Sequence, residues 1–144
     1  MWLMARIIAI DYGAKRTGIA VTDPLGIIAQ PLETVATHTL MDFLRGYIAR
    51  ESVERIIVGL PKQMDGSNSE NFRRIEPFVN RLRKEFPSIP VEYYDERFTS
   101  VLAHRAMIDG GVGKMARRDK AMVDRISAAI ILQGYMDSKK TDIL

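Results

Sequence analysis

Residues 6–22 read RIIAIDYGAKRTGIAVT, and this stretch decides the fold. Two β-rich runs, residues 6–10 and 17–22, flank a short polar segment that contains a glycine, which is the pattern of a β-hairpin. Residues 23–26 (DPLG) follow, with Asp, Pro and Gly at the positions that a type I turn prefers. A third strand is expected over residues 27–35. The chain is therefore predicted to open as a three-stranded antiparallel meander.

Beyond this meander, the spacing of apolar residues alternates between that of helices and that of strands. The expected elements are a helix over 39–50, a buried strand over 55–60, a helix over 67–86, a strand over 91–95, a short helix over 99–108 and a long helix over 119–136. Pro77 should kink or break the second helix near Glu76. This order predicts an α/β fold with a mixed five-stranded sheet flanked by helices, and the ribonuclease-H-like fold is the leading candidate.

The length and composition set limits on the class of protein. We expect one domain over residues 1–138 and a frayed tail over 139–144, because 144 residues can bury one core. The chain has no cysteine, which excludes disulfides, thiolate nucleophiles and cysteine-bound metals. The apolar run at the start is too short to span a membrane, whether Met1 or Met4 is the native first residue, so a cytoplasmic protein is expected. The net charge of +3 favours a polyanionic partner.

Three acidic residues stand out as candidate metal ligands. Asp11 and Glu96 each follow the end of an apolar strand, where functional groups of α/β sheets gather. Asp124 lies in a helix that is apolar nearly all round, so the helix is expected to be buried and the carboxylate to need a cation. The alternatives are a turn-forming role for Asp11, a solvated strand-end charge for Glu96, and a salt bridge from Lys120 or Arg125 to Asp124.

Taken together, the three carboxylates suit Mg²⁺ or Mn²⁺, which prefer oxygen ligands. Two such ions about 3.5–4 Å apart can activate a water and stabilise the leaving oxygen of a phosphodiester. No histidine pair spaced for a zinc hydrolase competes with this set, since His38 and His104 are the only histidines. We therefore expect Asp11, Glu96 and Asp124 to be both the catalytic and the metal-binding residues of a nuclease.

Four sequence motifs carry a resemblance to a known family. They are residues 8–13 (IAIDYG) with Lys15, Gly18, Ala20 and Val21; residues 57–61 (IVGLP) with 64–66 (MDG); residues 95–97 (DER) with Thr99 and Ser100; and Lys120 with Val123, Asp124, Ala128, Ala129, Ile131 and Leu132. In these motifs the chain resembles the YqgF-type Holliday-junction-resolvase-like family, the pre-16S ribosomal RNA nucleases of bacteria. The resemblance implies a ribonuclease-H-like fold, metal ligands at the same three acids, and trimming of the 16S ribosomal RNA precursor in the cytoplasm.

Several basic residues are candidates for contact with the phosphates of nucleic acid. They are Lys15, Arg16, Arg97, Lys114, Arg117, Arg118 and Lys120. Lys120 is favoured among them because it lies one helical turn before Asp124 and belongs to the family pattern. The expected partners are precursor ribosomal RNA or branched DNA, together with a ribosomal-subunit precursor; the sequence predicts no oligomeric state.

Three alternative functions remain open at this point. The first is resolution of Holliday junctions in DNA. The second is a nucleic-acid-binding module that has lost the chemistry and serves ribosome assembly or transcription. The third is an ATP-binding domain of the actin and sugar-kinase type, whose first phosphate loop resembles Asp11-Tyr12-Gly13 followed by Gly18. The length of the chain disfavours this last alternative, because such proteins close two domains around the nucleotide.

Overall fold

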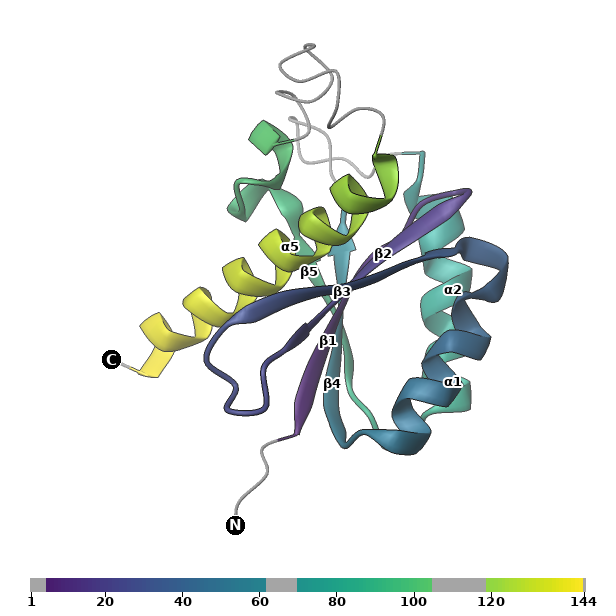
Figure 1. The fold of residues 1–144 in the computed structure, drawn as a ribbon, viewed down its shortest axis with the longest axis horizontal. Helices are drawn as coiled ribbons and strands as arrows, with labels where there is room; N and C mark the ends of the chain where they lie inside the picture. The colour runs from purple at the N-terminus through teal and green to yellow at the C-terminus, as the bar shows by residue number, and fades with distance from the viewer. Residues whose placement is uncertain (1–4, 62–69, 105–118, 144) are drawn as a thin grey trace.

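The structure, a computed structural model, describes residues 5–61, 70–104 and 119–143 of the chain (Figure 1). The first three strands are β1 (Arg6–Asp11), β2 (Arg16–Thr22) and β3 (Ala29–Ala36). β1 pairs antiparallel with β2, and β2 pairs antiparallel with β3, so the predicted meander is confirmed. The turn between β2 and β3 is closed by the Gly26 N–H, which donates to the Asp23 carbonyl oxygen at 2.9 Å.

Two further strands, β4 (Val53–Leu60) and β5 (Val91–Asp95), complete the sheet. β4 pairs parallel with β1 and with β5, which gives a mixed sheet in the order β3-β2-β1-β4-β5. This confirms the predicted mixed five-stranded sheet. Because β1, β4 and β5 are parallel, their carboxyl ends meet at one edge of the sheet. That edge contains the candidate site.

Helices cover both faces of the sheet (Figure 1). They are the 3₁₀ turn η1 (Thr37–Thr39), α1 (Leu40–Arg50), α2 (Phe72–Glu85), the 3₁₀ turn η2 (Glu96–Phe98) and α5 (Lys120–Ile143); residues 101–104 are also helical. α1 and α2 pack on one face, where Ile8, Ile10 and Leu44 belong to a single buried cluster. α5 lies on the other face, where Ala9, Ile57 and Ile131 belong to a second cluster.

The alternation of side chains along each strand assigns residues to these two faces. Ile8 and Ile10 of β1 face α1 and α2, whereas Ala9 faces α5. Asp11, two residues after Ala9, therefore lies on the α5 side. Fully burying an Ile or Leu side chain contributes about 1.5–3 kcal/mol. Because each face has its own apolar cluster, a one-residue slip of β1 would exchange its side chains between the two faces, disrupt the packing of both clusters and turn Asp11 away from α5.

Three expectations about the helices differ from the structure. α2 runs through Pro77 without the expected break; Pro77 is exposed, so a backbone carbonyl left without its partner can be hydrated. α5 continues to Ile143, well past Met136, and its extension includes a hydrogen bond from the Ser138 hydroxyl to the Tyr135 carbonyl. α5 is also not buried all round, because it lies on a sheet face and buries only the side that meets the strands.

Some expected features lie outside the described residues. They are residues 67–69 of the helix expected over 67–86, residues 105–108 of the helix expected over 99–108, and the basic residues Lys114, Arg117 and Arg118. Within the described ranges, no helix is long and apolar enough to cross a membrane.

Candidate active site

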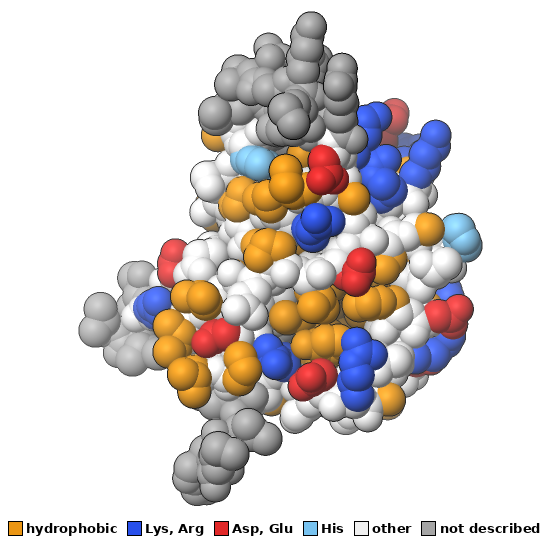
Figure 2. Space-filling view, in the orientation of Figure 1, with side chains coloured by type: hydrophobic (Ala, Val, Ile, Leu, Met, Phe, Trp, Pro, Cys, Tyr) orange, Lys and Arg blue, Asp and Glu red, His pale blue; other side chains and the backbone are white. Residues whose placement is uncertain are grey.

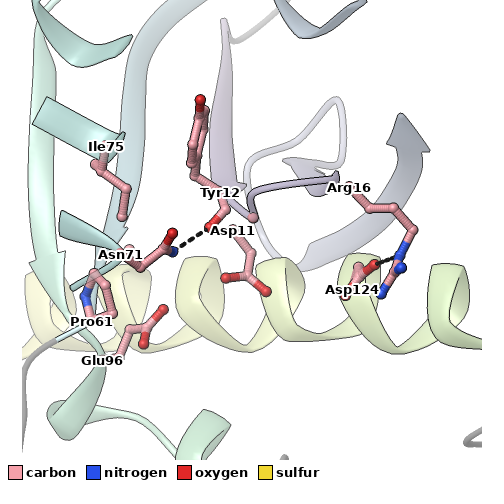
Figure 3. A pocket seen from close by; sticks show the side chains of 10 residues that line it. Asp11, Tyr12, Arg16, Pro61, Asn71, Ile75, Glu96 and Asp124 are labelled. Carbon is pink, nitrogen blue, oxygen red and sulfur yellow. Dashed lines mark hydrogen bonds and ion pairs between the residues drawn. The ribbon is translucent and has the colours of Figure 1, made fainter. Parts of the chain in front are cut away.

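The carboxyl edge of the parallel strands contains a cavity of about 210 Å³. Its lining includes Asp11, Arg16, Gly59, Asn71, Glu96 and Asp124. All three acids singled out in the sequence therefore line one cavity, although they come from three distant parts of the chain. Figure 3 shows Asp11 and Glu96 extending into the same space, with Asp124 turned toward Arg16.

Asp11 is the last residue of β1, and the hairpin that follows holds it at the cavity. It pairs in register with Gly18 of β2. The hairpin turn is tight, since a β-carbon on Gly13 would overlap the carbonyl oxygen of Arg16. The Thr37 hydroxyl fastens this turn to the end of β3 by donating to the Gly13 carbonyl at 2.7 Å. The backbone around Asp11 is thus braced from two sides.

Glu96 follows β5 directly and is buried, with 2% of its surface exposed. Its neighbour Asp95 is engaged elsewhere: it accepts hydrogen bonds from the Arg97 backbone N–H at 2.9 Å and from the Arg97 guanidinium at 2.8 Å. Asp95 is the last residue of β5, whereas Glu96 begins the 3₁₀ turn η2. Glu96 is the one that lines the cavity.

Gly59 provides the space between Asp11 and Glu96. β4 lies between β1 and β5. The backbones that carry the two acids are therefore two strand spacings apart, about 10 Å across the sheet. A β-carbon on Gly59 would lie 2.9 Å from Glu96 Oε1 and 2.7 Å from Ile131 Cδ1. The missing side chain therefore lets the Glu96 carboxylate lie over β4, toward Asp11. A glycine late in an apolar strand indicates a close approach, and this signal was available in the sequence.

Asp124 reaches the cavity because α5 lies directly on β2. A β-carbon on Gly18 would overlap the Asp124 carbonyl group, so only glycine permits this contact. The Asp124 carboxylate is 23% exposed and accepts a hydrogen bond from Arg16 Nε at 2.8 Å. The alternative to a metal at Asp124 was a salt bridge from Lys120 or Arg125; Asp124 does form a salt bridge, but with Arg16. Arg16 and Gly18 share the α5-facing side of β2, which explains this pairing.

Asn71 also lines the cavity, although no sequence motif indicates it. It immediately precedes α2, and its side-chain amide donates to the Tyr12 carbonyl oxygen at 2.9 Å. The Tyr12 ring packs against Phe78 of α2, with ring centroids 4.9 Å apart. Asn71 therefore ties the start of α2 to the residue after Asp11. No periodicity or charge pattern in the sequence marks such a backbone contact.

The candidate phosphate-binding residues have different environments. Lys15 and Lys120 are exposed, at the β1–β2 turn and at the first residue of α5. Arg16 is paired with Asp124, and Arg97 with Asp95. Figure 2 shows Lys and Arg side chains gathered at the upper right of this face, the end at which Figure 1 places the β1–β2 hairpin. This end of the molecule is suited to an anionic partner.

The donor set fits a hard divalent cation, since three carboxylates offer oxygen ligands and, among the described residues, no sulfur or imidazole nitrogen lines the cavity. Among the described residues, no group of three or more acidic or histidine side chains is already drawn together at metal-binding distances. The Asp124 carboxylate is instead bound to Arg16. The residues fit such an ion in the chemistry of their donor atoms and in the cavity that they share.

A mixed sheet of this order with acids at its carboxyl edge is the architecture of ribonuclease-H-like nucleases. A solved structure described as "T. thermophilus RuvC in complex with Holliday junction substrate" has the same fold, with a TM-score of 0.51 and 18% identity over 95% of this chain and 96% of that chain. The family model described as "RuvX: Holliday junction resolvase" matches residues 5–138. The chain belongs to this family of nucleases.

Curated relatives cover nearly the whole chain. Proteins from Phocaeicola vulgatus and Bacteroides thetaiotaomicron are 66% and 63% identical to it, over 95% of this chain and 99% of their own lengths. A protein from Flavobacterium johnsoniae is 51% identical over the same shares. All three carry the name "Putative pre-16S rRNA nuclease".

Proposed function

We propose that this protein is a metal-dependent endonuclease that processes the precursor of 16S ribosomal RNA, with Asp11, Glu96 and Asp124 as its metal ligands. The observation that carries the proposal is the convergence of these three carboxylates on one cavity at the carboxyl edge of the sheet. The names of the relatives support the substrate. Such a function belongs in the cytoplasm, where ribosomal RNA is processed in bacteria.

Each acid has a distinct part in holding the ion. Asp11 and Glu96 approach from the two sides of β4, and Asp124 approaches from α5 above β2. Mg²⁺ or Mn²⁺ suits this set because both prefer carboxylate oxygens and retain waters and phosphate oxygens as further ligands. When bound, the ion supplies activation of a water and stabilisation of the leaving oxygen.

The basic residues around the cavity would position the substrate. Lys15 lies in the turn between β1 and β2, Arg16 begins β2 and Lys120 begins α5, so all three lie near Asp11 or Asp124 and can contact phosphates next to the cleaved bond. Arg97 directly follows Glu96 in the chain, but its guanidinium forms an ion pair with Asp95. Lys114, Arg117 and Arg118 are proposed for the same role from sequence alone. Phosphate contacts of this kind position nucleic acid without reading its sequence.

A second candidate is cleavage of four-way DNA junctions, which the description of the family model favours. The same three carboxylates would serve, because the chemistry at the phosphodiester is shared. The two candidates differ in what the surface around the cavity must accommodate. A four-way junction presents two or more duplexes to the protein, whereas an RNA precursor presents single strands and stems.

The experiment offers the purified protein a precursor 16S ribosomal RNA fragment, a single-stranded RNA and a four-way DNA junction, each with Mn²⁺. Asp11→Asn and Asp124→Asn serve as controls, because each retains the side-chain shape but loses the charge. We expect cleavage of the precursor RNA that both substitutions abolish. Faster cleavage of the junction would favour the second candidate. Binding of RNA without metal-dependent cleavage by the wild type would instead indicate a non-catalytic module.

A further inference from the structure

We propose that Arg16 is an internal counter-ion for Asp124, which holds that carboxylate while no metal is bound and moves to a substrate phosphate when a metal replaces it. This inference rests on the proposed function, since it assumes that Asp124 is a metal ligand. It adds an ordered exchange at the site: one cation leaves Asp124 as another arrives.

The ion pair between Arg16 and Asp124 lies at the candidate metal site. Arg16 Nε lies 2.8 Å from Asp124 Oδ2, and both residues line the cavity that Asp11 and Glu96 share. The two partners are 108 residues apart in the chain, so the bond is made by the fold. It joins the start of β2 to the first turns of α5. The guanidinium therefore engages one of the two oxygens of a carboxylate that lines the candidate metal site.

The positive charge of Arg16 opposes metal binding at Asp124. A guanidinium bound to Asp124 brings a positive charge to the site at which a divalent cation would lie, and like charges at such a distance repel. Metal binding at Asp124 and hydrogen bonding by Arg16 to the same carboxylate therefore compete. Removal of Arg16 should strengthen metal binding.

The exposure of Arg16 permits this exchange. Its side chain is 43% exposed, so it can leave Asp124 without stranding a charge in the core. Its backbone pairs with Ala36 in the β2–β3 ladder, and its carbonyl oxygen lies close to Gly13 in the tight turn. Release of Asp124 therefore requires a movement of the Arg16 side chain alone. A guanidinium released at the rim of the cavity presents a planar donor fork that matches a phosphate. The same residue would then contribute to substrate binding.

The exchange predicts opposite effects of one substitution on two ligands. In Arg16→Gln, the affinity for Mn²⁺ without nucleic acid should rise about two- to fivefold, the range expected when a partly exposed ion pair no longer competes. The affinity for precursor RNA, measured with Ca²⁺ in place of Mn²⁺, should fall. A residue with only a structural role would not move these affinities in opposite directions.

The test is isothermal titration with Mn²⁺ on the wild type, Arg16→Gln, Arg125→Gln and Asp124→Asn. Arg125→Gln is the matched control, since it removes one positive charge beside Asp124 without touching the bond to Arg16. We expect tighter binding for Arg16→Gln than for Arg125→Gln. A second measurement needs no variant: the ¹⁵Nε–¹H resonance of Arg16 should shift when Mg²⁺ is added to the wild type.

The outcomes separate the two proposals. If the wild type binds Mn²⁺ through Asp124 but Arg16→Gln binds it no more tightly than Arg125→Gln, or the Arg16 resonance does not move, the exchange is overturned and the metal site stands. If the wild type binds no Mn²⁺, or Asp124→Asn binds it as well as the wild type, the proposed metal site itself fails. Tighter Mn²⁺ binding together with weaker RNA binding in Arg16→Gln supports the exchange.

Discussion

The backbone of Asp124 lies directly on Gly18. A β-carbon on Gly18 would collide with the Asp124 carbonyl group and lie 2.8 Å from the Arg125 backbone nitrogen. Gly18 is also the residue of β2 that pairs with Asp11. One glycine therefore connects two acids of the site, because it lets α5 approach β2 at the point where β1 ends. This contact makes the position of Asp124 sensitive to a single methyl group.

Gly18→Ala should destabilise the protein by about 1–3 kcal/mol, because the atoms that obstruct the new methyl group belong to the backbone of α5 and cannot rotate away. Urea unfolding would measure the change. Gly46→Ala is the matched control within α1: the nearest atom to its β-carbon is Arg50 Nη1 at 3.8 Å, so the helix should gain about 1 kcal/mol. Equal stability of the two variants would contradict this account of Gly18.

Gly59→Ala should separate stability from activity. Its new methyl group meets the ends of two side chains, Ile131 and Glu96, which can shift at a cost of about 1 kcal/mol. Displacement of the Glu96 carboxylate should nevertheless slow cleavage by about tenfold or more, since small errors in placement cost large factors in rate. Unfolding and Mn²⁺-dependent cleavage would be measured on the same preparation. A variant that cuts RNA at the wild-type rate would show that Glu96 needs no space over Gly59.

Asp23 provides a prediction about pH. Its pKa lies below the usual 3.8 because its carboxylate accepts hydrogen bonds from the Ile28 and Ile27 backbone N–H groups, at 2.8 Å and 2.6 Å. A lowered pKa in the folded state means that the stabilisation is complete at pH values above the usual 3.8 of the unfolded state and is lost as the pH falls through the folded-state pKa. An NMR titration of the carboxyl groups should therefore show that Asp23 becomes protonated at a lower pH than a free aspartate does.

The contribution of Asp23 to acid sensitivity can be tested with Asp23→Asn. This variant should lose less stability than the wild type as the pH falls below about 4, because it has no carboxylate to protonate. Unfolding in urea at a series of acidic pH values would reveal the difference. Parallel losses in the two proteins would mean that the turn does not depend on the ionised carboxylate.

Much of the fold could be predicted from the sequence because its signals are local. The hairpin of β1 and β2 follows from two β-rich runs around a glycine turn, and β4 from a continuous apolar run. The continuity of α2 through Pro77 and the length of α5 could not be predicted. Whether a proline is tolerated in a helix depends on the exposure of the turn around it, which only the packed structure sets.

The site was partly accessible to the same reasoning. Asp11 and Glu96 are strand-end acids, and strand-end placement is visible in a sequence. The partner of Asp124 was not, because neighbours on its own helix, Lys120 and Arg125, were the natural candidates, whereas Arg16 arrives through the fold. The space over Gly59 likewise depends on which strand lies between β1 and β5. Strand order is a long-range property that local patterns do not contain.

The most direct test of the central claim compares Mn²⁺-dependent cleavage of a precursor 16S ribosomal RNA fragment by Asp11→Asn, Glu96→Gln, Asp124→Asn and Asp95→Asn. The first three should each lose at least about 100-fold in rate, because each removes a proposed metal ligand. Asp95→Asn should lose far less, since Asp95 holds Arg97 and does not line the cavity. If any of the first three cleaves RNA as fast as the wild type, or Asp95→Asn is as impaired as Glu96→Gln, the assignment of the metal site is wrong.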